Sequence, residues 1–594
     1  MAEFTSSQSG NWSANSTWGG GGHPGDGDTA IISDTHVVTV DGYTVVGTSP
    51  ATNENVITGA GSGSLIIGTG VHIVVKGGIH TYSGSVTMNA GSHIEFVAPV
   101  DTQYRLYIGL WNAPNANLVA NGVLGNRCKI SCSGAGSAYF YHNIGADDGH
   151  SMPMCTLNYT DLEYLGNSST PAIHEVGGLT MQHCRVSHCG LVYLNGASIA
   201  QDVNIEYCNF SNGVNGSEPC QDVSINTTRD APNPGVLRRI RYNSFSNQAV
   251  FFALRGIAIV ENYFGMPPNH PVPVPTPPVL NAYFPATWDG NFIRDAQVAL
   301  AGIQFVPKCS LVQNDFIYNE TADDPLVYLP WLISNQEFDG LVIESKDWGP
   351  VDNGDWFLST INPYDAYNYT IHNCIELPSP GRKCSVTIFT SCGTANMAYR
   401  VYNNTFFAGE RGAAYVSDDN PGKAGSIEYF RNNIGWADIG STEAYLVKEQ
   451  LATHTPGYIT QCDYNGYFNL NANRYQITST LCADAYGVHD LHADPRFVDK
   501  DRNLSKWAHV VLGNPSSDGA VLRAAAVATL ASMNDESAVA YVPGVTVKGF
   551  TSWIKAGFAP TNPLFKTASS TGSFIGAVAP VTLNIAASLM MSVF

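Results

Sequence analysis

Charge is scarce in this chain. Only 13% of its 594 residues are Asp, Glu, Lys or Arg, and 29 basic residues stand against 49 acidic ones, for a net charge of −20. A nucleic-acid backbone is bound by a basic surface, so this balance excludes nucleic acid as a partner. Hydrophobic residues make up 44% of the chain. That content is enough to bury a core and excludes a disordered protein.

Long apolar runs and targeting signals are also missing. No run of about 18 apolar residues occurs, so we expect no membrane span. The first ten residues, Met1–Gly10, contain no basic segment followed by an apolar one, so we expect no secretory signal. The 13 cysteines are an odd number and lack close Cys-x-x-Cys pairs. This favours buried free thiols in a chain that folds under reducing conditions.

Amphipathic helices are absent from the first hundred residues, which instead contain short β-branched segments. These segments are separated by Gly or polar corners and are too short for helices; they are Thr29–Gly42, Ser64–Gly78 and Ser85–Val97. Such runs predict paired strands. Because no helical pattern of 10 to 15 residues lies between them, a βαβ sheet is excluded.

A repeated motif begins near residue 157 and continues for some 300 residues. An apolar residue is followed, three positions later, by Asn or another small polar residue, and then, after one more residue, by Phe, Ile or Val. Ile240 to Phe245 and Ile259 to Phe264 are examples. Successive motifs lie 19 to 35 residues apart, with one gap of 59. A fixed local motif with variable spacing predicts a solenoid of stacked strands joined by variable loops.

In a parallel β-solenoid, each residue lies about 4.8 Å from its counterpart in the next coil. Asn residues at such positions can pair their amides in an internal ladder. We expect this ladder to contain Cys184, Cys208, Asn243, Asn262, Asn314, Asn404 and Asn432. The two cysteines fit as small inward fillers, and a disulfide between them is the alternative.

These coils resemble right-handed parallel β-helix proteins of the pectin-lyase-like class. The opening Gly10–Asp28, with Asn11-Trp12, Thr17-Trp18 and Pro24-Gly25, is similar to the segment that precedes such helices. The closing Asp494-Pro-Arg-Phe-Val498 and Phe574-Ile-Gly-Ala577 are similar to their ending. The usual Ser-Pro-Ala-Ile-Asp-Ala-Gly is replaced by Ser516–Leu522, and about 50 extra residues precede Phe574.

The resemblance implies an all-β fold, a right-handed parallel β-helix with an N-terminal cap and a small C-terminal appendage. We place the cap at residues 1–28, the β-helix at 29–512, a C-terminal capping region at 513–580 and a strand or docking tail at 581–594. Within the capping region, Gly519 to Ser532 is rich in Ala, Val and Leu and predicts a short helix packed on the last coils.

Acidic and aromatic residues gather between Asp323 and Tyr369, within the gap of 59 residues. Carboxylates act as acid and base in glycan cleavage and accept sugar hydroxyls, while aromatic faces stack on sugar rings. The catalytic candidates are Asp323, Asp324, Glu337, Asp339, Glu344 and Asp347. The glycan-binding candidates are Tyr328, Trp331, Trp348, Trp356 and Tyr364. A loop packed on its own aromatics, or a subunit contact, is the alternative for the whole stretch.

Cofactor signals are weak. Asp499 to Asn503 begins like a calcium loop, but Leu504 replaces the Gly and Val510 replaces the Glu that such a loop requires. It is more simply part of the terminal-coil motif. The motif set of pectin hydrolases is not present in order. We therefore expect no metal site and no cofactor, with bound calcium as the one exception left open.

Proteins that this chain resembles divide between secreted polysaccharide enzymes and bacteriophage tail spikes or other virion proteins. Without a visible export signal, the leading hypothesis is a phage virion protein of the spike or fibre type that recognises a host-surface glycan. Its expected partners are copies of itself in a homotrimer, other virion proteins and the host polysaccharide. The alternatives are an extracellular polysaccharide lyase or hydrolase, and a self-assembling filament or surface protein with C-terminal strand exchange.

Overall fold

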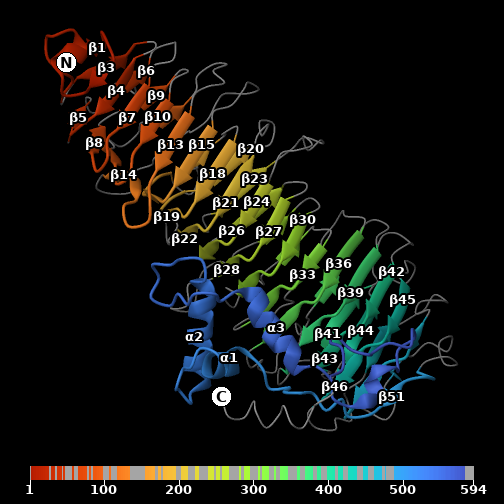
Figure 1. Cartoon of the computed structure of the whole chain (residues 1–594). Coiled ribbons are helices and arrows are strands. Elements are labelled where there is room, and N and C mark those ends of the chain that lie inside the picture. Colours follow the sequence, from red (N-terminus) through yellow and green to blue (C-terminus); the bar gives the residue numbers. More distant parts are fainter. Residues whose placement is uncertain are drawn as a thin grey trace. The chain divides into compact units, whose positions relative to one another are not determined.

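The computed structural model shows a chain of short parallel strands followed by three helices (Figure 1). It describes most strands and corners and the whole C-terminal region up to Val581. The described residues are 2–25, 28–33, 36–42, 44–46, 56–58, 64–75, 79–81, 85–97, 106–108, 117–133, 154–166, 172–174, 178–190, 192–195, 202–211, 221–226, 238–246, 249–253, 257–265, 280–282, 286–294, 305–307, 311–319, 327–328, 335–345, 358–360, 368–378, 384–389, 398–407, 412–418, 426–437, 446–451, 461–470, 475–476 and 487–581.

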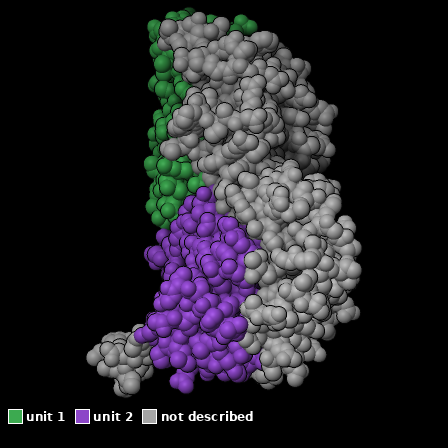
Figure 2. Space-filling view, turned by 90° about the vertical axis from the view of Figure 1, so that its right-hand side faces the viewer, with its two compact units in different colours: residues 1–258, 534–538 green, residues 259–533, 539–594 purple. Residues whose placement is uncertain are grey.

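The chain divides into two compact units, coloured in Figure 2. Unit 1 contains Met1–Ala258 together with Asn534–Ala538, and unit 2 contains Ile259–Met533 and Val539–Phe594. The boundary falls within strand β27 (Ile257–Val260). In each unit the strands form three kinds of parallel stack, and successive coils add one strand to each stack.

In unit 1, each described coil supplies consecutive strands to the three stacks. The first stack holds β2 (Gly10–Asn11), β4 (Val37–Val40), β7 (Ser64–Ile67), β10 (Ser85–Met88), β13 (Asn117–Asn121), β15 (Met154–Asn158), β18 (Gly178–Gln182), β21 (Val203–Glu206) and β24 (Arg238–Arg241). The second holds β5 (Thr44–Val46), β8 (His72–Val75), β11 (His93–Val97), β14 (Cys128–Ser133), β16 (Thr160–Glu163), β19 (Arg185–Ser187), β22 (Asn209–Ser211) and β25 (Ser244–Ser246). The third holds β1 (Glu3–Thr5), β3 (Thr29–Ile32), β6 (Val56–Thr58), β9 (Ile79–Thr81) and β12 (Leu106–Ile108), and then β17 (Ile173–His174), β20 (Val192–Asn195), β23 (Gln221–Asn226) and β26 (Ala249–Ala253).

Unit 2 repeats the arrangement. After β27, its first stack holds β30 (Ala286–Asp289), β33 (Leu311–Gln313), β36 (Asn335–Asp339), β39 (Asn368–His372), β42 (Ala398–Tyr402), β45 (Ser426–Arg431) and β48 (Cys462–Asp463). The second holds β28 (Tyr263–Gly265), β31 (Phe292–Arg294), β34 (Phe316–Asn319), β37 (Val342–Ser345), β40 (Ile375–Glu376), β43 (Thr405–Phe407), β46 (Ile434–Trp436), β49 (Gly466–Phe468) and β51 (Leu491–His492). The third holds β29 (Leu280–Ala282), β32 (Phe305–Pro307), β35 (Val327–Tyr328), β38 (Leu358–Thr360), β41 (Cys384–Phe389), β44 (Gly412–Asp418), β47 (Val447–Leu451) and β50 (Tyr475–Gln476). The expected all-β parallel β-helix is confirmed.

Alternating burial along the strands explains why this sequence forms coils. In β10 and β13, for example, every second residue is buried, as period-2 side chains on a half-buried strand require. In-register columns of Val, Leu, Ile and Met then fill the interior, such as Leu65, Val86 and Leu118. No helix that could span a membrane occurs among the described residues.

A buried polar ladder runs between the first and second stacks. Asn243 accepts the Cys208 amide at 2.9 Å in unit 1, and Asn404 donates to the Asn433 side chain at 2.9 Å in unit 2. Asn262 donates in the same way to Asn291 at 3.0 Å. Each such bond satisfies a polar group that burial would otherwise leave unpaired. The eight cysteines with described side chains are all free and buried, Cys184 and Cys208 included.

Two of the expected ladder residues lie elsewhere. Asn314 and Asn432 occupy the corner one residue before the ladder, with φ of 53° and 57°, and the ladder positions are taken by Asp315 and Asn433. In both coils two polar residues are adjacent. The motif fits Asp315 as well as Asn314, whereas at Asn433 the residue two positions later is Gly435, so the motif favours Asn432. The backbone conformation determines which residue takes the corner, because Asn tolerates the left-handed conformation there better than most residues do.

The second stack changes character between the units. In unit 1, the position after the ladder residue is polar in Asp161, Arg185 and Asn209, which are in register. In unit 2 the same column is apolar in Tyr263, Phe292, Phe316, Val342 and Ile375, all of them buried. An apolar outer column must be covered, and the C-terminal region covers it.

Three helices carry out this covering: α1 (Leu504–Val510), α2 (Gly519–Ala531) and α3 (Val547–Gly557). Figure 1 shows α3 alongside the strands of unit 2. Phe550 of α3 packs edge-on against Phe316 with ring centroids 4.7 Å apart. The helix predicted over Gly519–Ser532 is therefore α2, and it shares one core with coils from Tyr263 to Trp436.

The boundary expected at residue 512 falls two residues after α1 and 20 residues after the last strand, β51. At the other end, the Trp12 indole donates to Pro24 O at 3.0 Å and the Trp18 indole donates to Trp12 O at 2.8 Å, which closes the N-terminal cap. The proposed tail, apart from Val581, lies outside the described residues.

Candidate functional site

Most of the acidic and aromatic stretch lies outside the described residues. This applies to Asp323, Asp324, Trp331, Asp347, Trp348, Trp356 and Tyr364. Tyr328 belongs to β35, of which only the backbone is described. The proposed glycan-binding roles of these residues stay predictions.

Glu337 and Asp339 are brought together with a histidine that the sequence did not single out. His372 on β39 is in register with Asp339 on β36, and its Nε2 lies 2.7 Å from the Glu337 carboxylate. Its Nδ1 lies 2.9 Å from the side-chain nitrogen of Asn373, which donates to Asp339 at 2.8 Å, and 3.5 Å from the Asp339 carboxylate itself. The imidazole is largely buried and stacks on Tyr402, while both carboxylates are partly exposed. An imidazole bonded to a carboxylate on one side and to an amide on the other is an arrangement that general acid–base catalysis uses.

Glu344, by contrast, is a structural residue in this fold. It is 7% exposed, and its carboxylate accepts the backbone N–H of Leu504 at the start of α1, at 2.9 Å. Burial raises the pKa of Glu344 to about 7. With its carboxyl facing the C-terminal region, Glu344 has no surface on which to meet a polymer substrate.

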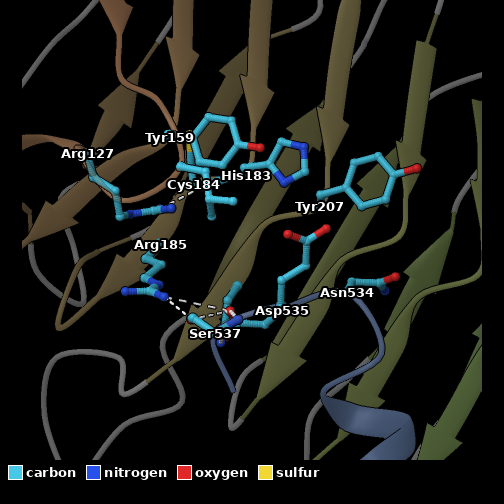
Figure 3. Close-up of a pocket in the computed structure, with 12 residues that line it drawn as sticks. Arg127, Tyr159, His183, Cys184, Arg185, Tyr207, Asn534, Asp535 and Ser537 are labelled. Carbon is cyan, nitrogen blue, oxygen red and sulfur yellow. Dashed lines mark hydrogen bonds and ion pairs between the residues drawn. The ribbon is translucent and has the colours of Figure 1, made fainter. Parts of the chain in front are cut away.

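A ladder of outward-facing rings forms the first candidate site, in unit 1 (Figure 3). Tyr159, His183 and Tyr207 stand at the positive-φ corners of successive coils, with centroid spacings of 4.4 Å and 4.9 Å. The Arg127 guanidinium lies 5.8 Å from the Tyr159 ring centroid and donates to His183 O at 2.6 Å. Burial lowers the pKa of His183, which favours the neutral imidazole.

The segment Asn534–Ala538 already occupies this ladder site. Figure 3 shows Asp535 and Ser537 reaching Arg185, and the Asp535 carboxylate lies 3.7 Å from the guanidinium. Asn209 adds a bond to Asp535 at 3.4 Å. The remaining cavity measures about 40 Å³, enough for a few water molecules. We therefore interpret the ladder site as a docking place for this segment.

A much larger cavity lies in unit 2, and we name it the terminal-coil pocket. It is lined by Trp436, Ala437, Phe468, Asn469 and residues 494–501, and it measures about 400 Å³. This volume is within the range of small-ligand sites. The segment 494–501 is the Asp-Pro-Arg-Phe-Val motif with the three residues that follow it.

Aromatic and polar groups converge on the terminal-coil pocket. Trp436 is 2% exposed, and its indole N–H has no hydrogen-bond partner among the described residues. Phe497 packs edge-on against the Trp436 ring at 5.5 Å, and the Lys500 ammonium lies 5.3 Å from the centroid of the same ring. The indole nitrogen is buried, so a ligand in the pocket does not reach it and meets the edges of the aromatic rings instead.

The charged groups of the terminal-coil pocket are of both signs. Asp499 is bound to Lys506 at 2.6 Å, and one Asp494 oxygen accepts the Arg496 backbone N–H at 2.8 Å. Asp501 is largely exposed and lies 3.8 Å from the Lys500 ammonium, and the Arg496 side chain makes no ion pair with the part of the chain that the structure describes. Charged donors and acceptors beside aromatic rings are the groups that bind a polyhydroxylated ligand.

Comparison of the chain with models of known protein families, with curated proteins and with solved structures finds no match.

Proposed function

We propose that this chain is a bacteriophage virion protein of the tail-spike or fibre type that recognises a host-surface glycan through the terminal-coil pocket. The observation that carries the glycan part is the pocket itself: about 400 Å³ lined by Trp436 and Phe468, with carboxylates and cations at its rim. A cavity of this size accepts one or two sugar rings, and the aromatic wall and mixed charges suit hydroxyl-rich ligands.

The parallel β-helix supports the virion part of the proposal. A solenoid of short, mutually paired strands offers a rigid lateral surface. The chain would then assemble as a homotrimer, which would cover exposed edges by symmetric contact, and would join other virion proteins. Its location would be the virion, with an extracellular protein as the alternative. Native mass spectrometry should give three times the 63.7 kDa chain, and the chain should be detected in purified phage particles.

Glycan recognition is tested with the full chain and an array of bacterial surface polysaccharides, followed by calorimetry on any hit. Arg496→Asn and Asp501→Asn together should weaken binding about tenfold, because each removes a charged hydrogen-bonding group from the rim. Asn tolerates the positive φ of 51° at residue 496, so the corner should keep its shape. Glu3→Gln, an exposed charge change in unit 1, serves as the control.

The outcomes separate clearly. Binding that falls in the double variant and not in Glu3→Gln supports the pocket. Binding that is unchanged in the double variant removes the pocket from the proposal. Absence of binding to any bacterial polysaccharide contradicts the glycan function.

A polysaccharide hydrolase or lyase is the second candidate function, and one observation favours it. The His372 imidazole pairs with Glu337 at 2.7 Å, and Asn373 connects its other nitrogen to Asp339, an arrangement suited to proton transfer with Glu337. Release of oligosaccharide from a bound glycan should then be lost in His372→Asn and in Glu337→Gln, while binding is retained. Release by the wild type that continues in both variants would exclude this cluster as the catalytic one.

A further inference from the structure

Three metal-ligating side chains gather on the outer face of the second stack in unit 1. His72 begins β8 and His93 begins β11, and the two residues are in register on neighbouring parallel strands. Glu95 lies two residues after His93 and therefore on the same face of the strand. One ligand atom from each side chain lies within 4.8 Å of the other two.

The strand register aligns the two imidazoles. Their ring centroids are 4.1 Å apart with an interplanar angle of 13°. The His72 Nε2 lies 2.8 Å from a Glu95 carboxylate oxygen. The sheet fixes the backbones at the three positions, so the ligands are brought together before any ion binds, and only the stacked rings have to rotate for their nitrogen lone pairs to converge.

Hydroxyl groups from the next coil support these ligands. Ser131 on β14 bonds the His93 Nε2 at 2.7 Å, and Ser133 donates to a Glu95 carboxylate oxygen. Lys129, which is in register with His93, has its ammonium 2.8 Å from Glu163. The nearest cation on β14 is thus paired with a carboxylate other than Glu95. Outer hydrogen bonds of this kind orient metal ligands and tune their affinity.

We propose that His72, His93 and Glu95 form a binding site for a first-row divalent transition-metal ion, with Zn²⁺ as the ion that fits best. Two imidazoles and one carboxylate are ligands of intermediate softness, whereas Ca²⁺ and Mg²⁺ prefer sites made only of oxygen. Tetrahedral Zn²⁺ with Zn–N bonds of about 2.0–2.1 Å brings its ligand atoms to roughly 3.4 Å from one another. Small side-chain rotations close the present separations to that value.

The bound ion would link two successive coils. His72 belongs to one coil, and His93 and Glu95 belong to the next, so their coordination joins β8 to β11 through side chains as well as through the backbone ladder. Water would complete the coordination at the exposed side. The expected consequence is greater stability of the N-terminal coils, because the ion binds the folded chain and not the unfolded one.

The test uses the full chain after treatment with a chelator. Titration with ZnCl₂ in a calorimeter should show one site per chain, and Zn²⁺ should raise the thermal midpoint of unfolding, whereas Ca²⁺ should do neither. His72→Gln, His93→Gln and Glu95→Gln should each weaken Zn²⁺ binding by at least about tenfold. His489→Gln is the matched control, since His489 is also stacked, on Tyr464, and paired with a carboxylate, Asp463, but belongs to no group of three ligating side chains among the described residues.

Several results would overturn the proposal. These are absence of Zn²⁺ binding at millimolar ion, binding that survives all three variants, and binding that is lost equally in His489→Gln. If a histidine variant fails to fold, Glu95→Gln and the absorption spectrum of the Co²⁺-loaded wild type replace it. Intense visible bands of tetrahedral Co²⁺ that vanish in Glu95→Gln support the site, and their absence from the wild type contradicts it.

Discussion

At the scale of single residues, one carboxyl interrupts a ladder of amides. Asp315 is fully buried, and its Oδ1 accepts both the backbone N–H of Asn291 at 2.7 Å and its side-chain N–H at 3.1 Å. Burial, together with the charges of Asp289 and Glu261, raises the pKa of Asp315 well above its ordinary value. Where an Asn occupies this position, it donates to a carbonyl of the preceding coil, as Asn291 does to Ile259 O.

We predict that Asp315→Asn stabilises the protein near neutral pH. Asn keeps the acceptor oxygen and supplies the donor that the other coils use, for a gain of about 1 kcal/mol. Because the pKa of Asp315 is raised in the folded state, its contribution to wild-type stability is fully present below pH 3.8, the ordinary pKa of Asp. This contribution is lost as the pH rises. The advantage of the variant should therefore grow with pH in urea unfolding experiments at pH 5 and pH 8. A variant less stable than the wild type at pH 8 would contradict this.

The residue pattern predicted that the ladder exists. It did not predict at every coil which of two adjacent polar residues belongs to the ladder. Asn243 and Asn262 have no Asn or Asp beside them, and the motif places them without ambiguity. Asn404 follows Asn403, and the motif selects Asn404 because Val401 and Phe406 flank it at the required spacing. Asn314-Asp315 and Asn432-Asn433 offer two neighbouring candidates. Only the corner geometry, a positive φ at the first residue of each pair, separates the two candidates, and composition carries no record of it.

At the scale of elements, two buried carboxyl groups join helices to coils. Glu261 accepts the backbone N–H of Val547 at the start of α3 at 3.1 Å, and Glu344 accepts that of Leu504 at the start of α1. Lys548 and Asp289 lie near Glu261, and Arg523 acts on Glu344. Burial dominates in both cases and raises the pKa of each carboxyl to about 7.

We predict that docking of α1 and α3 weakens as the pH rises. A carboxyl pKa near 7 in the folded state, against 4.5 ordinarily, stabilises the docked form fully below pH 4.5, and this contribution is lost as the pH rises through 7. Glu261→Gln and Glu344→Gln keep an acceptor and remain neutral. Each variant should match the wild type at pH 4.5 and exceed it at pH 8 by roughly 2 kcal/mol. Hydrogen exchange of α1 and α3 at both pH values measures this, and equal exchange in wild type and variants at pH 8 would refute it.

Helix docking was less predictable than the helices themselves. The composition of Gly519–Ser532 predicted the helix α2. It did not predict the surface on which the helices dock, because that surface is an apolar column through Phe292 and Phe316 that only the strand register aligns. Gly290 and Gly340 stand at corners with φ of 71° and 72°, a backbone conformation that favours glycine, and a Cβ at either one would also lie within 3 Å of Lys548 or Lys555 of α3. The terminal-coil pocket likewise needs three separate segments, and His372 needs its register with Asp339.

At the scale of the whole molecule, a solenoid derives its stability from contacts between neighbouring coils. Each coil buries its core against its immediate neighbours and does not need distant coils. Unfolding is therefore cooperative only across neighbouring coils that strong interfaces connect. The chain divides after Ala258 into two compact units, each with its own internal contacts. Unit 2 has in addition the apolar cover of its second stack, whereas the second stack of unit 1 has polar residues in the same column.

We therefore predict that the two units unfold in separate transitions, with unit 2 the more stable. Asn243→Ala removes a buried ladder side chain from unit 1, and Asn433→Ala removes the equivalent one from unit 2. Each change should cost about 1–3 kcal/mol, because it leaves backbone groups of neighbouring coils unpaired. Hydrogen exchange in increasing urea, followed by mass spectrometry of peptides from β21 and β45, reads the two units separately. Asn243→Ala should lower the midpoint of the β21 peptide and leave that of β45 in place, and Asn433→Ala should do the reverse. The contrary result would be a single midpoint that both peptides share and that either variant lowers. It would mean that the two units unfold together, because destabilising the ladder of one unit would then also unfold the other unit.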